Sequence, residues 1–334
     1  MNAQTHWLPK VAKADHAMRK RALLFVGLGG LVAGAFLPWI SQGAPFVLVL
    51  ACHALIAALL AVSLDMLMGN TGLLSFGHGA WYGLGAYTTG LLAKHLSPEM
   101  VVVLPLAVLT AVLIAIAVAF ILVRQIGKAF AILTLALGQV FYALVFIASK
   151  YTGGEDGLQG VPTPTLFGMQ LSSSAAWYWV LYVSLVVVLL IASWVRQSPL
   201  GRAWLGLTDN PERAAFIGLD VFRLKFMAYV GSAGVAAFAG AMFALFNGAA
   251  SPDTLHWFES GKILMYVVLG GVGTLFGPAL GAIVFTVSEH YVSSFTDSWL
   301  IYFGALFVVV VIVAPGGIAG LIQPVWNRLT KGFV

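Results

Sequence analysis

Apolar runs long enough to cross a bilayer recur along the whole chain and are separated by short polar turns. A membrane-spanning helix needs about 20 such residues. Only 9% of the residues are charged, whereas about a quarter are charged in a soluble domain. Because 60% of the residues are hydrophobic, a soluble chain of this composition could not cover its own surface. We therefore predict an all-α integral membrane protein, built as a polytopic helical bundle.

The apolar runs predict ten membrane segments. They are 21–38, 46–68, 79–93, 100–123, 130–149, 177–195, 226–247, two short segments within 261–291, and 298–314. If 261–291 were one kinked span instead, the carboxyl end of the chain would lie outside. The last residues include Arg328 and Lys331 but no acidic residue. Because cytoplasmic segments have an excess of Lys and Arg, we favour two segments that meet near Gly270–Pro278.

The same charge rule predicts that both termini lie in the cytoplasm. We expect a basic tail at 1–20, a transmembrane domain at 21–320 and a second tail at 321–334. Within the domain, the loop 150–175 has few charges and is expected outside, and the loop 196–225 is rich in Arg and Lys and is expected inside. The start of the chain also resembles a signal peptide, but its basic region is long for one, so we expect an uncleaved first span.

Two apolar stretches, 64–92 and 269–284, are interrupted by many glycines. An unpaired backbone group in hydrocarbon is costly, so a broken helix is tolerated only inside protein or beside a water-filled path. Paired stretches of this kind in two halves of a membrane protein indicate a translocation site between them. We therefore expect a transport pore here, without a buried charged cluster. The likeness between 72–77 and 273–277 is too short to establish an internal repeat.

Two ionisable residues stand in the first stretch. Asp65 is either a functional carboxylate at membrane depth or an end-of-span residue that caps the broken helix at Gly69–Gly72. For His78 we favour a packing or hydrogen-bonding role over a titrating one, because its glycine neighbours supply no charge partner.

The loop 198–225 has two signals for the start of a helix. Ser198 precedes a proline, and Asp209 and Asn210 precede a second proline. The second helix is expected to end at Gly218. A solvated connector would not need the small apolar face of this helix, so we favour a segment that docks on a soluble partner.

The sequence contains no motif for catalysis. It has no nucleotide-binding loop, no H-E-x-x-H zinc site and no G-x-S-x-G nucleophile turn. The single cysteine, Cys52, excludes an internal disulfide and a cysteine metal cluster. We expect no catalytic residue, no metal and no cofactor. The net charge of +5 belongs to cytoplasmic loops and does not indicate a nucleic-acid partner.

Three stretches, 63–92, 198–245 and 264–284, resemble the permease subunits of ABC importers for branched-chain amino acids, specifically the longer LivM type. With the span pattern, the likeness covers about 60–320. It implies a pore in a bacterial inner membrane, formed with a second permease subunit, two cytoplasmic ATPase subunits and a periplasmic solute-binding protein. ATP hydrolysis would belong to the partners. Related permeases for urea, amides or other amino acids leave the solute open.

The resemblance also assigns roles to residues. The translocation pathway would fall on Asn70, Thr71, Gly72, Ser75, Gly77, His78, Gly270, Gly271 and Gly273, to which Asp65 is added from its own position. ATPase coupling would fall on Gly201, Arg202, Asn210, Pro211, Glu212, Ala214, Ala215 and Gly218. The alternative is a stand-alone ion-coupled transporter, in which Asp65 or Glu289 would bind the coupling ion.

Overall fold

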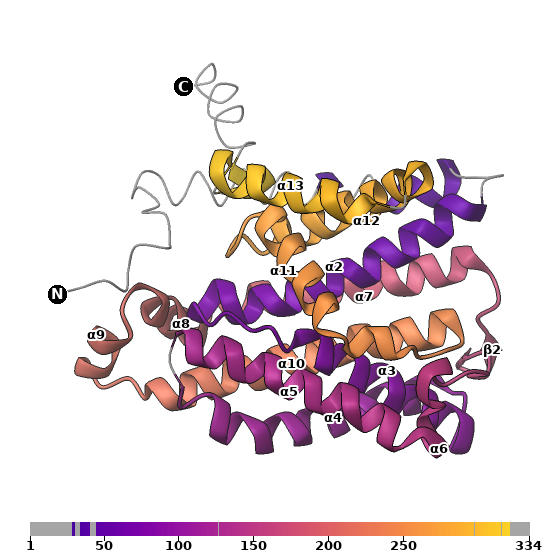
Figure 1. The fold of residues 1–334 in the computed structure, drawn as a ribbon, viewed down its shortest axis with the longest axis horizontal. Helices are drawn as coiled ribbons and strands as arrows, with labels where there is room; N and C mark the ends of the chain where they lie inside the picture. The colour runs from indigo at the N-terminus through magenta and orange to yellow at the C-terminus, as the bar shows by residue number, and fades with distance from the viewer. Residues whose placement is uncertain are drawn as a thin grey trace.

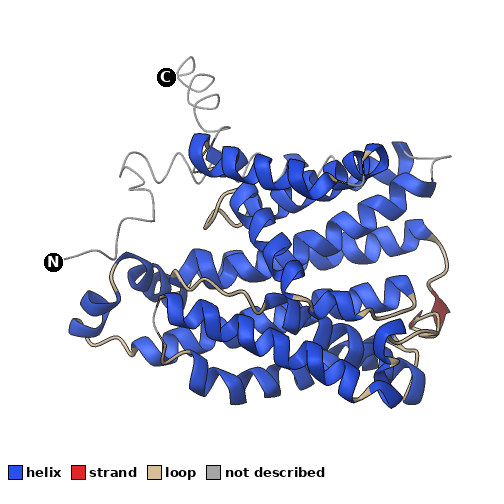
Figure 2. Cartoon of the chain, in the orientation of Figure 1, coloured by secondary structure: helices blue, strands red, loops and turns tan. Residues whose placement is uncertain are grey.

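The structure is a computed structural model, and it describes residues 29–30, 34–40, 45–125, 127–296, 298–314 and 316–320. Long helices run side by side, and the only described strands form one small hairpin (Figures 1 and 2). The two terminal tails, the positions of both termini and most of the predicted span 21–38 lie outside the described residues.

The described elements follow one another from α2 to α13. The longer helices are α2 (Pro45–Thr71), α3 (His78–His95), α4 (Met100–Leu122), α5 (Lys128–Ile147), α7 (Ser174–Gln197), α10 (Val221–Asn247), α11 (Trp257–Gly270), α12 (Phe276–Phe295) and α13 (Trp299–Val313). The shorter elements are α6 (Ser149–Thr152), η1 (Gly154–Asp156), β1 (Thr165–Leu166), β2 (Met169–Gln170), α8 (Pro199–Asp209), α9 (Pro211–Phe216) and η2 (Pro252–Leu255). The strands β1 and β2 pair antiparallel.

Six helices in the described part of the chain are long and apolar enough to cross a bilayer. They are α2, α4, α5, α7, α10 and the stretch Leu300–Gly320, which contains most of α13. The all-α, multi-pass membrane architecture is therefore as predicted. The count of ten also needs 21–38, α3, α11 and α12, and it stays a prediction. The predicted division of 261–291 agrees with the structure, since α11 ends at Gly270 and α12 starts at Phe276.

Helices α8 and α9 project from one end of the bundle, and the β1–β2 hairpin lies at the opposite end (Figure 1). We call these the α8–α9 end and the hairpin end. The loop 150–175 belongs to the hairpin end, where Leu158 pairs with Ala250 and Thr165 pairs with Glu99. The two loops that were predicted on opposite sides of the membrane thus lie at opposite ends of the bundle.

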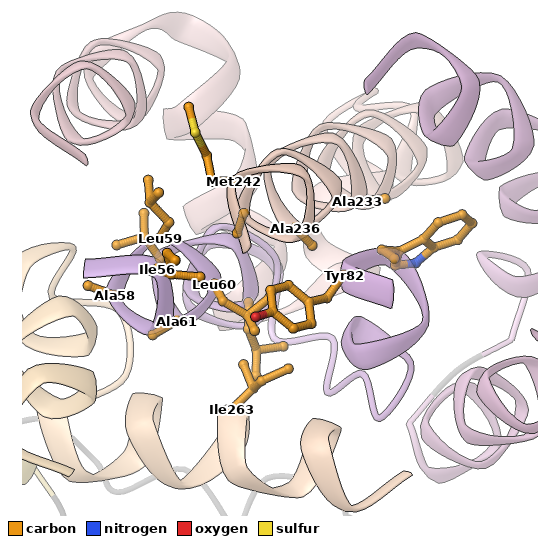
Figure 3. Packing of buried hydrophobic residues seen from close by; sticks show 14 of the residues in the cluster. Ile56, Ala58, Leu59, Leu60, Ala61, Tyr82, Ala233, Ala236, Met242 and Ile263 are labelled. Atoms are coloured by element: carbon orange, nitrogen blue, oxygen red, sulfur yellow. The ribbon is translucent and has the colours of Figure 1, made fainter. Parts of the chain in front are cut away.

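Helices α2 and α10 form the centre of the bundle and pack against each other, and α10 also packs closely against α3 (Figure 3). Small residues let these backbones approach closely. A Cβ at Gly240 or Gly85 would collide with the carbonyl of Tyr82 or Ala237. On α4, by contrast, one stripe with alanine at every fourth position from Ala107 to Ala119 is buried, and large apolar side chains such as Leu109, Leu113 and Phe120 are exposed. Such an outer face suits contact with lipid.

The chain contains two sets of four helices, α2–α5 and α10–α13, that pack in a reciprocal way. The long helix α10 packs against α3 and α4, and the long helix α2 packs against α11 and α12. Helix α2 ends at the α8–α9 end, where α10 begins, so the two sets run in opposite directions (Figure 1). Reciprocal packing in opposite directions is the arrangement expected of an inverted repeat. It pairs the break at 72–77 with the loop between α10 and α11, and not with 273–277 as the short sequence likeness suggested.

Candidate functional site

The first helix break covers residues 72–77, later than predicted, because α2 continues through Gly69 to Thr71. Gly72 turns the chain with φ +71°, a conformation that glycine adopts without strain. The side chains of Asn70 and Thr71 are buried and donate to the carbonyls of Met66 and Leu67, at 2.9 and 2.8 Å. These two side chains therefore complete the end of their own helix.

The rest of the break is held by α5 and by a hydrogen bond within the break itself. The amide of Phe76 donates to the Thr134 hydroxyl at 3.1 Å, and the Ser75 hydroxyl accepts from the Gly77 amide at 3.2 Å. A Cβ at Gly77 would lie 2.6 Å from the carbonyl oxygen of Thr134. This glycine is thus needed for close contact between the break and α5.

His78 joins three helices through one hydrogen-bonded chain. Its Nε2 lies 2.5 Å from the Ser232 hydroxyl, which donates to the Ser63 carbonyl at 2.8 Å. Because the serine has given its only proton to that carbonyl, the histidine Nε2 must be the donor. The Nδ1 atom is buried and has no partner among the described residues. This geometry supports a neutral, hydrogen-bonding His78.

Asp65 caps the second break and not the end of its own helix, which was one of its two predicted roles. Its carboxylate accepts from the amides of Gly273 at 2.6 Å and Leu275 at 3.3 Å. Leu275 has a φ of +68°, unfavourable for leucine, so a bond that holds its amide stabilises a strained turn. The guanidinium of Arg196 donates to the carbonyl of Gly273. The structure therefore shows a third role for Asp65, distinct from the two that were predicted. Its side chain connects α2 to the α11–α12 turn, and we call this connection the clamp.

Glycine contacts complete this clamp. A Cβ at Gly69 would lie 2.7 Å from the Cα of Gly273, and a Cβ at Gly270 would collide with the Gly277 carbonyl. Gly271, with φ +110°, is packed against the backbone of Gly316. We call Asp65, Gly69, Arg196, Gly270, Gly271 and Gly273 together the glycine junction.

A cavity of about 350 Å³ lies among α2, α3, α10, α11 and α12. Its lining comprises Leu50, His53, Ile56, Ala57, Leu60, Tyr82, Phe243, Glu259, Lys262, Tyr266, Thr286, Glu289, His290 and Ser293. We call it the charged cavity. None of the ten residues predicted for the pathway lines it, because they form the break at 72–77 and the glycine junction.

No buried charged cluster was expected in the pathway, and the charged cavity contains one. The Lys262 ammonium lies 3.4 Å from a Glu259 oxygen and 3.3 Å from a Glu289 oxygen. These side chains are only 18–21% exposed. A signal was present in the sequence: Glu259 and Lys262 are three residues apart, a spacing that brings them together on one helix face, in a mostly apolar region.

The predicted helix starts in the loop 196–225 are confirmed. The Ser198 hydroxyl accepts from the Gly201 amide at 3.3 Å, and the Asn210 side chain accepts from the Arg213 amide at 3.0 Å. Trp204 anchors α8 to α10 through a bond of 2.8 Å from its indole to the Leu224 carbonyl. The second helix ends at Phe216, two residues before the predicted Gly218.

The eight coupling candidates divide by exposure. Arg202, Pro211, Glu212, Ala215 and Gly218 are exposed and Asn210 is half-buried, whereas Gly201 and Ala214 are buried. Because Gly201 and Ala214 are buried, they can contribute to ATPase coupling only through packing inside this chain. Two neighbouring apolar side chains outside this set of eight, Phe216 and Ile217, are 90% and 78% exposed. The carbonyl of Asn70 also accepts from the Thr208 hydroxyl at 2.7 Å, so α8 is tied directly to the end of α2.

No group of three metal-ligating side chains occurs in the part of the chain that the structure describes. Residues 46–315 match the family described as branched-chain amino acid transport system / permease component. The chain belongs to this family. The resemblance drawn from the glycine-rich stretches and the loop 198–225 is thereby confirmed, and the protein is a multi-pass membrane permease component.

Individual relatives are also permease proteins. The high-affinity branched-chain amino acid transport system permease protein LivM of Escherichia coli K12 is 32% identical over 82% of this chain and 70% of its own length. The LivH permease protein of Salmonella typhimurium is 25% identical, over 79% of this chain and 91% of its own. The autoinducer 2 import system permease protein LsrC of Salmonella paratyphi B is 30% identical over 41% of this chain and 40% of its own. No solved structure gave a significant match.

Proposed function

We propose that the chain is a permease subunit of an ATP-binding-cassette importer in the inner membrane of a bacterium. It works with a second permease subunit, two cytoplasmic ATPases and a periplasmic binding protein, and it moves branched-chain or other hydrophobic amino acids inward. The names of the relatives LivM and LivH support this solute class. LsrC, whose name gives a different solute, matches a smaller part of the chain.

The observation that carries the proposal is the exposed apolar surface at the α8–α9 end. Phe216 and Ile217 project into solvent there beside Glu212 and Arg213. A large exposed apolar pair with a charged rim is typical of a protein–protein interface. In this proposal, the surface docks on an ATPase subunit.

Two contacts connect this surface to the membrane domain. The hydroxyl of Thr208 on α8 bonds the end of α2, next to the break at 72–77. Arg196, at the end of α7 and just before α8, bonds the α11–α12 turn in the glycine junction. A displacement of α8 by an ATPase would therefore reach both breaks. Alternating access is the resulting mechanism, with these two sites as the moving joints.

The test uses the assembled complex in proteoliposomes with ATP on the ATPase side. Phe216→Asp places a charge in the proposed interface, and Glu212→Arg reverses one on its rim. Because truncating or charging an interface anchor commonly costs 2 kcal/mol or more, we expect uptake to fall by about thirtyfold for Phe216→Asp. Met169→Asp is the matched control, since Met169 is 72% exposed at the hairpin end. Normal uptake and normal transport-linked ATP hydrolysis in both variants would refute docking at α9.

The alternative, a stand-alone ion-coupled transporter, needs a carboxylate that is free to bind an ion. Asp65 already accepts two backbone hydrogen bonds, and Glu289 is paired with Lys262. Both contacts favour the importer. The alternative predicts ion-driven uptake by the purified chain alone, whereas the importer predicts uptake only with the partner subunits and ATP.

A further inference from the structure

The charged cavity places one ammonium between two carboxylates inside the membrane domain. The Lys262 ammonium interacts with Glu259 on its own helix and with Glu289 on α12. The phenol of Tyr266 interacts with the same ammonium. Because two carboxylates face one ammonium, the cluster has an excess of negative charge. Ionisable groups are costly inside a membrane protein and commonly mark the path of a solute or ion.

The ion pairs are not needed to join α11 to α12. These helices already meet through glycine, since a Cβ at Gly270 or Gly281 would collide with backbone atoms across the pair. The turn between them is capped by Asp65. A purely structural role therefore does not explain why this wall is charged.

The wall of the cavity also offers an unused polar group. The hydroxyl of Thr286 is buried and has no hydrogen-bond partner among the described residues. A buried hydroxyl without a partner is destabilising, so a hydroxyl in this state is suited to bond a ligand. It lies on α12, one turn from Glu289.

The opposite wall is mostly apolar. Leu50, Ile56, Ala57 and Leu60 of α2 contribute to it, together with Phe243 of α10. The imidazole of His53, also on α2, lines this wall and packs near the Phe243 ring. Ile56 and Leu60 lie close to Tyr82 in the packed centre of the bundle (Figure 3). The cavity is thus charged on the side of α11 and α12 and mostly apolar on the side of α2 and α10. A pocket with an apolar wall and a few convergent polar groups is the usual form of a small-molecule site.

We propose that the charged cavity binds an α-amino acid zwitterion with an aliphatic side chain. The carboxylate of the solute interacts with Lys262, its ammonium interacts with Glu259 and Glu289, and the Thr286 hydroxyl completes the polar contacts. The aliphatic side chain lies on the wall formed by α2 and Phe243. The inference rests on the proposed function for the class of solute. It adds that the permease has a binding site of its own, at which solutes are distinguished by size and charge.

The first test narrows the cavity by enlarging a side chain in its apolar wall. Ala57→Leu adds bulk to the cavity, so it is expected to reduce leucine uptake more than alanine uptake. Uptake by the assembled complex in proteoliposomes should fall about tenfold for leucine and less than about twofold for alanine, in line with the effect of one or two methylenes on pocket selectivity. The matched control is Ala117→Leu on the exposed face of α4. An unchanged ratio of leucine to alanine uptake in Ala57→Leu would contradict the proposal.

The second test separates binding from structure. Lys262→Gln should lower leucine uptake by about tenfold or more, because a charged partner of the solute is lost. The double variant Lys262→Glu with Glu289→Lys keeps one ammonium and two carboxylates in the cluster, since Glu259 is unchanged, but moves the ammonium from α11 to α12. A structural pair would be restored by this exchange, whereas a binding site would not. Recovery of leucine uptake in the double variant would overturn the proposal, and complex assembly measured by size exclusion confirms that each variant is folded.

The two proposals fail in different ways. If the wild-type complex takes up no amino acid with its partners and ATP, the proposed function is wrong. If the wild-type complex takes up leucine, and Ala57→Leu and Lys262→Gln behave like Ala117→Leu, only the binding site is assigned wrongly.

Discussion

The glycine junction and the charged cavity are built largely from the same three helices, α2, α11 and α12, yet they are packed in opposite ways. At the junction, backbone touches backbone, and the polar groups of Asp65 and Gly273 are paired. In the cavity, side chains separate the helices, and the Thr286 hydroxyl is unpaired. Broken, glycine-rich backbone therefore forms the tight contact between these helices, and the cavity proposed to bind the solute lies between regular helices.

The largest effect on folding stability is expected from placing a side chain in the glycine junction. Gly270→Leu would force a side chain into the backbone of Gly277 and Pro278, and we expect a loss of about 3 kcal/mol or more of folding free energy. The yield of monodisperse protein and its thermal unfolding in detergent measure this loss. Gly304→Leu on α13 is the control, because no atom lies within 4 Å of a Cβ there. Equal stability of the two variants would show that the glycine junction is not packed more tightly than other parts of the bundle.

A smaller effect is expected from removing the charge of the clamp. Asp65→Asn keeps the shape but weakens the bonds to the amides of Gly273 and Leu275, and bonds to a charged group contribute about 1.5–3 kcal/mol. Hydrogen exchange at these two amides should accelerate at least tenfold, since about 1.4 kcal/mol corresponds to a factor of ten. Asp253→Asn, at an exposed position, should leave them unchanged. Unaltered protection in Asp65→Asn would show that the glycine packing alone holds the turn.

The smallest expected effect is a change in folding stability on replacing two threonines by valine, and it has opposite signs at the two positions. Thr134→Val removes a hydroxyl that accepts from Phe76 and donates to Ala131, so we expect a destabilisation of about 1 kcal/mol. Thr286→Val removes an unpaired hydroxyl from the cavity, so we expect a stabilisation of about 1 kcal/mol in the absence of solute. Thermal unfolding of both variants under one condition checks the signs. A destabilised Thr286→Val would show that this hydroxyl has a partner in the folded protein.

The helices were predictable from the sequence because bilayer thickness and apolarity constrain them directly. The limits of α4, α5 and α10 follow from long apolar runs between polar turns, and the starts of α8 and α9 follow from local caps at Ser198 and Asn210. These signals act between neighbours in the chain.

The partners of single residues were not predictable in the same way. Asp65 lies more than 200 positions from the amides that it caps, and Lys262 reaches Glu289 on another helix. Glycine also allows two outcomes, since it suits both a water-filled path and a tight contact between backbones. Only the three-dimensional arrangement separates these outcomes. At Gly69 and Gly270 it shows tight contact.

Helix α2 has one further consequence for the mechanism. It contributes Leu50 and Ala57 to the cavity and Asp65 and Gly69 to the junction, in a continuous helix of 27 residues. At 1.5 Å per residue its length is about 40 Å. With no proline after its first position and its only glycine in the last turn, it is a stiff rod. Rotation of α2 where Thr208 of α8 contacts it would therefore also move Leu50 and Ala57, and so change the shape of the cavity at the opposite end of the helix.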